Sequence, residues 1–177
     1  MTTAYDIPRS APTGHPTAHR GAHAAFAPVA FIVGSNLAGV LGVLVSDTGT
    51  SPWFMALEKP SFMPPTWLFA PVWTLLYTLM GIAAWRVWRR WGWAGAPGAL
   101  SAFGVQLALN ALWTPVFFGL HDLGMGLVII VALWLAIAVT IGTFRRKDRL
   151  AAWLLAPYLT WVSFATALNA AILMLNA

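Results

Sequence analysis

The chemically distinctive side chains of this sequence are indoles, a phenol and a carboxamide inside long apolar segments. Trp73, Tyr77, Asn110 and Trp161 occupy such positions, whereas Asp, Glu, Lys and Arg lie outside these segments or at their ends. Ion-coupled transport and proton relays use ionisable groups at that depth, and hydrolysis uses Ser-His-Asp, Cys-His or paired-carboxylate sets. Because the segments carry no such set, their residues favour stacking on a ligand over acid–base catalysis.

Five apolar segments carry these side chains, and each is long enough to cross a bilayer, which takes about 20 apolar residues as a helix. The composition agrees, because 59% of the residues are hydrophobic and 8% are charged, whereas a soluble domain has about 25% charged residues. We therefore predict an all-α membrane protein, a five-transmembrane-helix bundle over residues 26–175. The predicted spans are 27–46, 67–88, 97–119, 124–144 and 150–173.

Residues 1–25 mix Pro, Gly, Ala, Thr and His without periodicity. Such a segment buries too little apolar surface to offset the entropy of ordering, so we predict a disordered amino-terminal tail. Its His15, His19 and His23 are spaced by four, which on a helix would place three imidazoles on one face as a metal site. A proline and a glycine between them argue against that helix, and we predict no metal site.

The net charge of +5 arises from basic residues that cluster near the ends of the predicted spans. Positive charge at such positions marks the cytoplasmic side of a helical membrane protein. We therefore predict that the amino terminus and both basic clusters are cytoplasmic and that the protein has no nucleic-acid partner. Helical spans favour a bacterial inner membrane over an outer membrane. The clusters are Arg86, Arg89 and Arg90, and Arg145, Arg146, Lys147 and Arg149.

A long loop, residues 47–66, joins the first two spans. Its four prolines restrict the backbone, and Trp53 and Phe54 are among the apolar side chains that can pack. Long ordered loops tend to be lids or binding segments, so we predict a capping loop over one end of the bundle. The alternative is an interfacial segment whose aromatic side chains lie at head-group level, and Trp53 alone fits either interpretation.

Helical spacing places the polar and aromatic residues in one layer beneath this loop. Prolines in three spans would free backbone carbonyls and bend the helices, which helps a bundle to open a cavity. We therefore predict a ligand pocket in this layer. At about 1.5 Å per residue, the depths are roughly 9–15 Å for Asn36, Trp73, Tyr77, Asn110 and Ala165, and about 18 Å for Trp161. The prolines are Pro71, Pro115 and Pro157.

Each of these residues also has a structural interpretation. Asn110 and Asn169 can form hydrogen bonds between helices, which we favour for Asn169. Trp73 and Trp161 can be packing residues, although their distance from the span ends argues against an interfacial belt. Tyr77 needs a partner for its hydroxyl group.

Several motifs extend over residues 30–170 and together carry a family resemblance. They are Lys59-Pro60 with Pro64-Pro65 and Trp67, Pro71-Val72-Trp73-Thr74 with Tyr77, Gln106-Leu107-Ala108-Leu109-Asn110 with Trp113, and Pro157-Tyr158-Leu159 with Trp161. The pattern resembles the tryptophan-rich sensory protein and translocator protein family, also called the peripheral benzodiazepine receptor family. The resemblance implies a homodimer in the lipid bilayer. It also implies a pocket for tetrapyrroles such as protoporphyrin IX and haem, for sterols and for benzodiazepine-type ligands, with no required cofactor.

The resemblance also implies site residues. By motif position these are Trp53, Trp73, Tyr77, Asn110, Trp161 and Ala165. In some bacterial relatives the pocket supports light-dependent porphyrin breakdown, in which Trp73 and Trp161 would be oxidised alongside the bound ring. The protein could instead transport porphyrin or sterol, or act as a sensor through a partner protein. A carboxylate of the ligand would meet Lys59 or His121.

Two further features bear on ligand choice and assembly. The residues after Asn169 lack the Tyr and Arg of a proposed sterol motif, so the sequence gives that motif no support. Small residues also form stripes that could let helices approach closely within one chain or between two copies, and the resemblance favours the third span for a dimer. The stripes are Gly34, Ala38 and Gly42 on the first span, and Gly104, Ala108 and Ala111 on the third.

Overall fold

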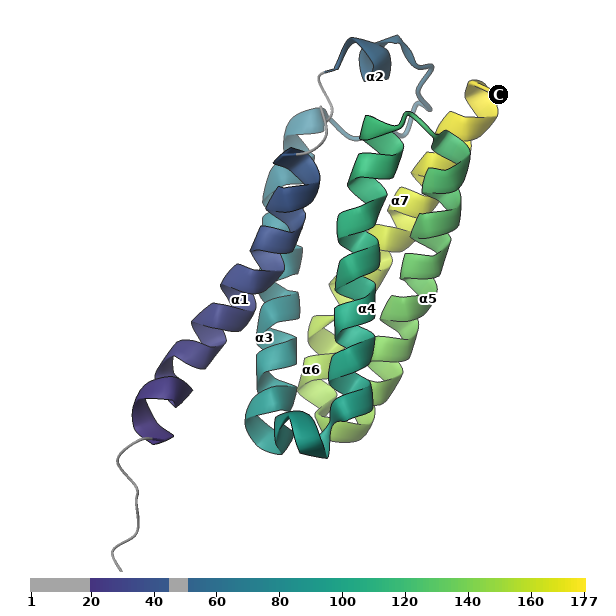
Figure 1. Ribbon diagram of the computed structural model, residues 1–177. Coiled ribbons are helices and arrows are strands. Elements are labelled where there is room, and N and C mark those ends of the chain that lie inside the picture. The colour runs from purple at the N-terminus through teal and green to yellow at the C-terminus, as the bar shows by residue number, and fades with distance from the viewer. Residues whose placement is uncertain (1–19, 45–50) are drawn as a thin grey trace, which may run out of the picture.

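The computed structural model describes residues 20–44 and 51–177, without the side chains of residues 20–25, 42 and 43, and its regular secondary structure there is helical throughout. The predicted all-α class is therefore confirmed for the described residues. Figure 1 shows the long helices side by side, with α2 above one end of the bundle. The α-helices are α1 (Arg20–Leu44), α2 (Pro52–Ala56), α3 (Phe69–Gly95), α4 (Pro97–Thr114), α5 (Leu123–Lys147), α6 (Arg149–Leu154) and α7 (Ala156–Leu175), with a 3-10 turn at Thr66–Leu68 and a π-helical turn at Pro115–Gly119.

Four helical stretches in the described part of the chain are long and apolar enough to cross a membrane. They are Thr66–Gly95, Pro97–Gly119, Leu123–Lys147 and Arg149–Leu175. The described part of α1 contributes a shorter apolar helix, Phe26–Leu41. The structure thus supports a multi-pass membrane protein with four helices of spanning length, and the predicted fifth span stays a prediction.

The amino-terminal prediction lies largely outside the described residues. Helix α1 begins at Arg20, within the predicted tail, and residues 1–19 are not described. The imidazoles of His15, His19 and His23 are also outside the described part. Among the residues that are described, no group of three or more His, Cys, Asp or Glu side chains could hold a metal ion.

Prolines and a glycine determine where several helices bend or begin. Pro115 opens the π-helical turn, and Pro157 lies in the first turn of α7, after a break at Leu155. Pro71 lies in the first turn of α3, where its missing N–H costs no helical hydrogen bond. Contrary to our prediction, it therefore does not bend that helix. Helix α3 continues beyond its predicted end and kinks at Gly92, whose φ of 63° is a conformation that favours glycine.

The two halves of the bundle pack differently. In the half away from α2, alanines of α3 and α6 are almost fully enclosed: Ala83, Ala84 and Ala151 are 0% exposed and Ala152 is 6% exposed. Their short side chains let these helices approach closely, and they belong to the larger of two buried apolar clusters. This half is therefore closed by direct helix packing.

Helix α1 approaches α3 closely at Gly81. A Cβ atom added to Gly81 would lie 2.6 Å from the Cα atom of Ile32, which is on α1. Only a glycine leaves room for that backbone. Figure 1 shows that the amino-terminal part of α1 leans away from the other helices, so the contact near Gly81 positions α1 on the bundle.

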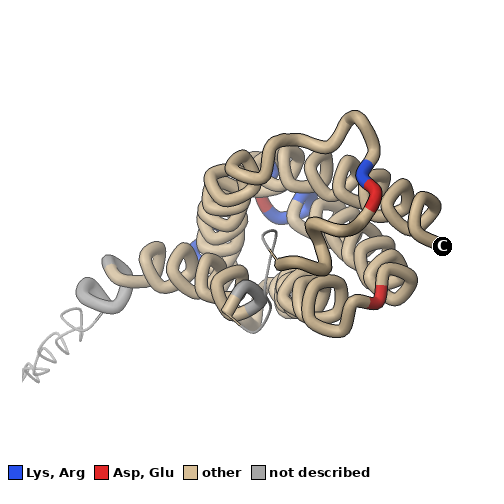
Figure 2. The backbone as a smooth tube through the Cα atoms, turned by 90° about the horizontal axis from the view of Figure 1, so that it is seen from above, with Lys and Arg blue, Asp and Glu red and all other residues tan. Residues whose placement is uncertain are grey.

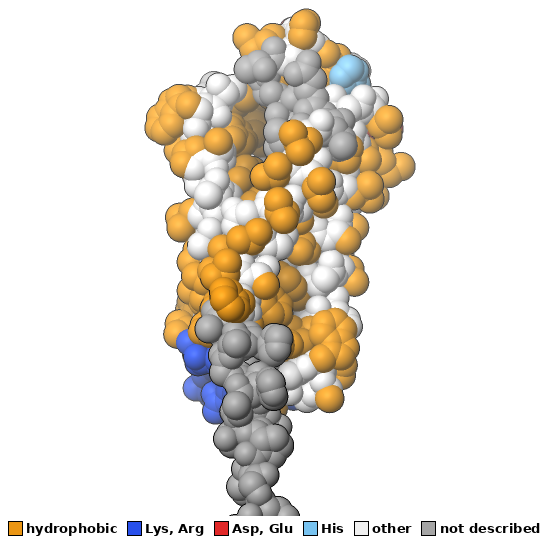
Figure 3. All heavy atoms as spheres, turned by 60° about the vertical axis from the view of Figure 1, so that its left-hand side comes forward, with side chains coloured by type: hydrophobic (Ala, Val, Ile, Leu, Met, Phe, Trp, Pro, Cys, Tyr) orange, Lys and Arg blue, Asp and Glu red, His pale blue; other side chains and the backbone are white. Residues whose placement is uncertain are grey.

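At the basic end of the bundle, defined by the two clusters of Lys and Arg, an ion pair joins α3 to the start of α6. Arg86 donates from a guanidinium nitrogen to a carboxylate oxygen of Asp148 at 2.9 Å, and Asp148 also accepts from the backbone N–H of Ala151. Burial opposes ionisation of Asp148, but the Ala151 and Arg86 contacts outweigh it and hold the pKa of this carboxyl group below its usual value. Lys147 reinforces this end, because its ammonium group donates to the carbonyl oxygen of Gly95. In Figure 3 the blue side chains lie at this end of a mainly apolar face, which is hollowed near the opposite end.

The opposite end, here called the cap end, is covered by residues 51–66. Ser51 caps α2 by accepting a hydrogen bond from the backbone N–H of Phe54 at 3.2 Å. The amide of Asn176 clamps this segment, since its Oδ1 accepts from the N–H of Glu58 and its Nδ2 donates to the carbonyl oxygen of Glu58, both at 2.9 Å. Figure 2 looks down on this end and shows the segment passing over the ring of helices.

Candidate ligand pocket

A cavity of about 610 Å³ lies beneath the cap segment, in the half of the bundle nearer α2. Side chains from α1, α3, α4, α5, α7 and the cap segment line it. Its volume is within the range of roughly 300–1,000 Å³ that is typical of small-molecule sites. Six residues that we placed in one layer from the sequence all line the cavity: Asn36, Trp73, Tyr77, Asn110, Trp161 and Ala165.

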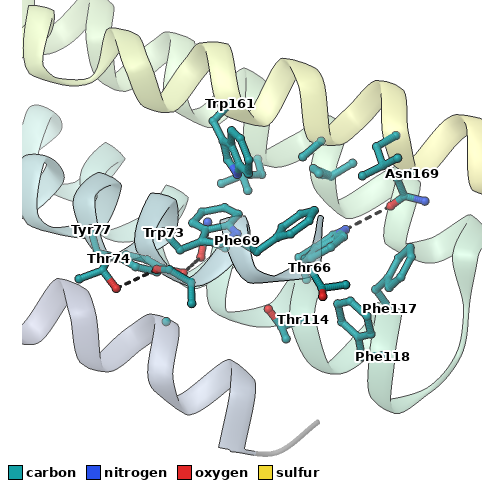
Figure 4. A pocket seen from close by; sticks show the side chains of 18 of the residues that line it. Thr66, Phe69, Trp73, Thr74, Tyr77, Thr114, Phe117, Phe118, Trp161 and Asn169 are labelled. Carbon is teal, nitrogen blue, oxygen red and sulfur yellow. Dashed lines mark hydrogen bonds between the residues drawn. The ribbon is translucent and has the colours of Figure 1, made fainter. Parts of the chain in front are cut away.

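Two indoles from different helices form aromatic walls of the cavity. Trp73 of α3 lies 5.5 Å from the ring centroid of Tyr77 and is tilted by only 30° from it. Trp161 of α7 makes an edge contact with Phe69, with ring centroids 5.7 Å apart. Figure 4 shows both indoles projecting into the space between α3 and α7. A flat apolar ligand would find stacking surfaces on two sides.

The polar centre of the cavity is Asn110, which lies between two tyrosines. Its Oδ1 accepts a hydrogen bond from the hydroxyl group of Tyr77, and its Nδ2 donates to the hydroxyl oxygen of Tyr158 at 2.9 Å. Tyr77 thus has the hydroxyl partner that we expected it to need. Because these bonds join α4 to α3 and α7, Asn110 both links helices and lines the cavity.

Trp161 presents an unsatisfied donor at the cavity wall. Its indole Nε1 is buried and has no hydrogen-bond partner among the described residues. A buried N–H without a partner costs about 1–3 kcal/mol, so a ligand that offers an acceptor here would remove that cost. The side chain therefore offers a stacking surface at the cavity wall and a donor that has no partner among the described residues.

A second polar cluster lies nearer the cap, around Asn169. Its Oδ1 accepts from the indole N–H of Trp113 at 3.2 Å, and its Nδ2 donates to the carbonyl oxygen of Leu123 at 3.1 Å. These bonds, one of which is drawn in Figure 4, join α7 to α4 and α5. The predicted role of Asn169 in bonding between helices is confirmed. Gly126 leaves room for the cluster, because a Cβ atom there would lie 3.3 Å from Asn169 Oδ1.

Trp53 is the predicted site residue that the structure does not place in this cavity. Its ring stacks on the imidazole of His121, with centroids 4.1 Å apart and planes 17° apart. His121 belongs to the turn between α4 and α5 and has a φ of 57°. The neighbouring Phe54 points inward instead, is 5% exposed and lines the cavity. Apart from Thr66, the cap segment therefore contributes apolar side chains, Phe54 and Met63, to the cavity wall.

The site residues that we predicted from the sequence omit several aromatic side chains of the cavity wall. Trp113, Phe117 and Phe69 line the cavity, and two ring pairs organise them: Trp113 with Phe117 at 4.9 Å, and Phe69 with Trp161. Trp113 belongs to one of the motifs that carry the family resemblance, so its motif position could have identified it as a site residue. Among the described side chains, no Asp, Glu, Lys, Arg or His lines the cavity.

Comparisons with known proteins agree with this architecture. A sequence model described as the TspO/MBR family matches residues 30–175. The chain belongs to the TspO/MBR family. This confirms the resemblance inferred from the motifs.

Named relatives extend the match over most of the chain. The tryptophan-rich protein TspO of Archaeoglobus fulgidus is 42% identical over 149 residues, which cover 84% of this chain and 96% of that protein. Protein CrtK of Rhodobacter capsulatus is 41% identical over 153 residues, covering 82% of this chain and 90% of the relative. The translocator protein of Homo sapiens is 41% identical over 119 residues, which cover 66% of this chain and 70% of that protein. The family match over residues 30–175 includes most of α1 and all of the other helices that form the cavity.

Proposed function

We propose that this protein binds a planar, largely apolar tetrapyrrole, such as protoporphyrin IX or haem, in the cap-end cavity and has a sensory or regulatory role. The observation that carries the proposal is the pair of indoles, Trp73 and Trp161, on two walls of one cavity of about 610 Å³. Stacking and burial of the ring would supply most of the affinity. The tetrapyrrole is a ligand here, not a cofactor.

The polar groups suit the same ligand class. The free N–H of Trp161 can donate to an acceptor on the ring or its substituents. Asn110 is already bonded to two tyrosines, which fixes its orientation before a ligand arrives and lowers the entropy that binding costs. A sterol or benzodiazepine-type ligand would also use the apolar walls.

The second candidate function is light-dependent porphyrin degradation, which the indoles at the cavity wall favour. Bound porphyrin would lie within reach of Trp73 and Trp161, the two side chains that we expect to be oxidised with it. Transport of porphyrin or sterol is less favoured, because Ala83, Ala84 and Ala151 close the half of the bundle below the cavity.

For assembly, we propose a homodimer through α4. Gly104 and Ala108 are exposed on this helix, and a Cβ atom at Gly104 would have no atom within 4 Å. Packing within the chain therefore does not use this part of the stripe, and a second copy could approach it closely. We also propose that the basic end faces the cytoplasm of a bacterial inner membrane, since positive residues mark that side.

A titration of protoporphyrin IX in darkness, followed by its absorption spectrum in a neutral detergent, tests the proposal. Saturable binding is expected, weaker by about threefold to tenfold in Trp161→Phe because one donor and part of a stacking surface are lost. Asn110→Ala should also bind more weakly. Trp153→Phe is the matched control, because Trp153 is 74% exposed and lies outside the cavity. Unsaturable binding that no variant changes would contradict the proposal.

Illumination of the same samples separates binding from degradation. Loss of porphyrin absorption in the wild-type protein that requires both light and oxygen would favour porphyrin degradation, provided that Trp161→Phe at saturating porphyrin shows no such loss. Stable absorption under light, with binding intact, would exclude it.

A further inference from the structure

A second, shallower cavity lies on the cap segment and adjoins the first. It has a volume of about 410 Å³, and both cap-segment residues and the start of the 3-10 turn line it. Phe54, Met63 and Thr66 line this groove as well as the main cavity. The two spaces therefore meet at these three side chains. Lys59 contributes the charged side chain of the groove.

The ammonium group of Lys59 is held in place by neutral partners. Its Nζ donates to the carbonyl oxygens of Met55 at 3.2 Å and Leu57 at 3.0 Å. It also lies 4.9 Å from the ring centroid of Phe54, a residue that borders both spaces. An ammonium group has three N–H donors, so one remains for a ligand. Because the side chain is already ordered, an anion that binds there does not have to immobilise it.

No other described cation competes with Lys59 at this end of the protein. The other Lys and Arg residues with described side chains belong to the two clusters at the basic end. The described part of the chain contains one ion pair, Arg86–Asp148, so Lys59 is not paired with the adjacent Glu58. Glu58 does not line the groove. His121, the other residue expected to meet a carboxylate, stacks on Trp53 and lines neither space.

We propose that Lys59 binds an acidic substituent of the ligand, so that the site selects molecules with a flat apolar body and a projecting carboxylate. The body lies against Trp73 and Trp161 in the main cavity, and the carboxylate extends past Phe54 and Met63 to the third N–H of Lys59. This inference rests on the proposed tetrapyrrole function and adds the group that distinguishes an acidic ligand from a neutral one.

A comparison of protoporphyrin IX, which bears two carboxylic acids, with its dimethyl ester tests the inference. Both are titrated in darkness against the wild-type protein, Lys59→Met and the control Lys147→Met, in one neutral detergent at low salt. Methionine keeps the apolar stem of lysine and removes the charge. Differences in how the two porphyrins partition into micelles cancel when the ratio of their affinities is compared between proteins.

The ratio of the affinity for the free acid to that for the ester should be about tenfold higher in the wild-type protein than in Lys59→Met, as a hydrogen bond to a charged group predicts. In Lys59→Met the affinity for the acid should fall by about tenfold, while the affinity for the ester stays unchanged. Lys147→Met should keep the wild-type ratio.

Three results would overturn the inference. Unchanged affinities of Lys59→Met for both porphyrins would mean that Lys59 does not recognise the carboxylate. Equal weakening of both porphyrins in Lys59→Met would mean that the lysine only orders the cap. In both cases porphyrin binding itself would stand. The absence of saturable binding of either porphyrin to the wild-type protein would instead reject the proposed function, and the inference with it.

Discussion

The contact between Gly39 and Tyr77 gives a sharp test of how α1 shapes the cavity. A Cβ atom added to Gly39 would lie 2.2 Å from Cε2 and 2.5 Å from Cζ of the Tyr77 ring. Non-bonded carbon atoms prefer separations of about 3.5–4.0 Å, so Gly39→Ala must displace either the ring or the helix. The hydroxyl group of that ring donates to Asn110, and the displacement therefore reaches the polar centre of the site.

The magnitude follows from opposing effects. Alanine favours a helix over glycine by about 0.8–1.0 kcal/mol, which would stabilise the protein if space were available. Overpacking of a close contact costs about 1–3 kcal/mol, and weakening the bond between Tyr77 and Asn110 adds about 0.5–1.5 kcal/mol. The net expectation for Gly39→Ala is a loss of roughly 1–3 kcal/mol, together with porphyrin affinity reduced by about tenfold.

Gly34→Ala is the matched control, because it makes the same change on the same helix where no atom lies within 4 Å of the new Cβ. Thermal unfolding in detergent measures stability, and a change of 1 kcal/mol shifts the Tm of a protein of this size by about 2–4 °C. Gly34→Ala should melt at or slightly above the wild-type temperature, and Gly39→Ala several degrees below it. If the two variants melt together and bind porphyrin equally well, the close contact of Gly39 with Tyr77 is wrong.

Three further predictions concern the contacts that hold the bundle and its cap. Asp148→Asn leaves Arg86 without its charged partner and should lower the free energy of unfolding by about 1–3 kcal/mol. Because the pKa of Asp148 is lowered in the folded protein, the stability of the wild-type protein should fall as the pH drops below about 4. The Tm of the variant should change less over that range. Asn176→Ala removes both bonds to the cap backbone and should accelerate hydrogen exchange in residues 51–66, as mass spectrometry can measure, while exchange in α5 stays unchanged. Trp113→Phe leaves a buried amide oxygen without its donor and should lower the Tm by an amount equivalent to about 1–3 kcal/mol, an effect that would be absent if the bond contributed nothing.

The layer of site residues could be predicted because a transmembrane helix converts sequence position into depth. With a rise of about 1.5 Å per residue, Trp73, Asn110 and Trp161 had to lie at similar levels if their helices ran the full thickness of the membrane. Their motif positions then identified the side that faces inward. Both signals are local, and the structure places all three residues around one cavity.

The cap could not be predicted in the same way, because its orientation depends on contacts between distant parts of the chain. Trp53 and Phe54 are neighbours in one short helix, and the sequence does not decide which of them turns inward. Packing of Phe54 against Phe118, with ring centroids 5.2 Å apart, and stacking of Trp53 on His121 settle the orientation. The clamp formed by Asn176 also joins residues that are 118 positions apart.

The enclosed alanines of α3 and α6 close the bundle on the side of the cavity that faces the basic end. A ligand bound there as we propose would exchange with the cap side or with the surrounding lipid, because Ala83 and Ala151, both 0% exposed, separate the cavity from the basic end. The ligand concentration that determines occupancy would therefore be that on the cap side or in the lipid, and not that at the basic end. If the protein has the proposed sensory role, a response at the basic end would require a conformational change, and α3 offers a connection because it carries both Trp73 at the cavity and Arg86 of the ion pair about 20 Å farther along its axis.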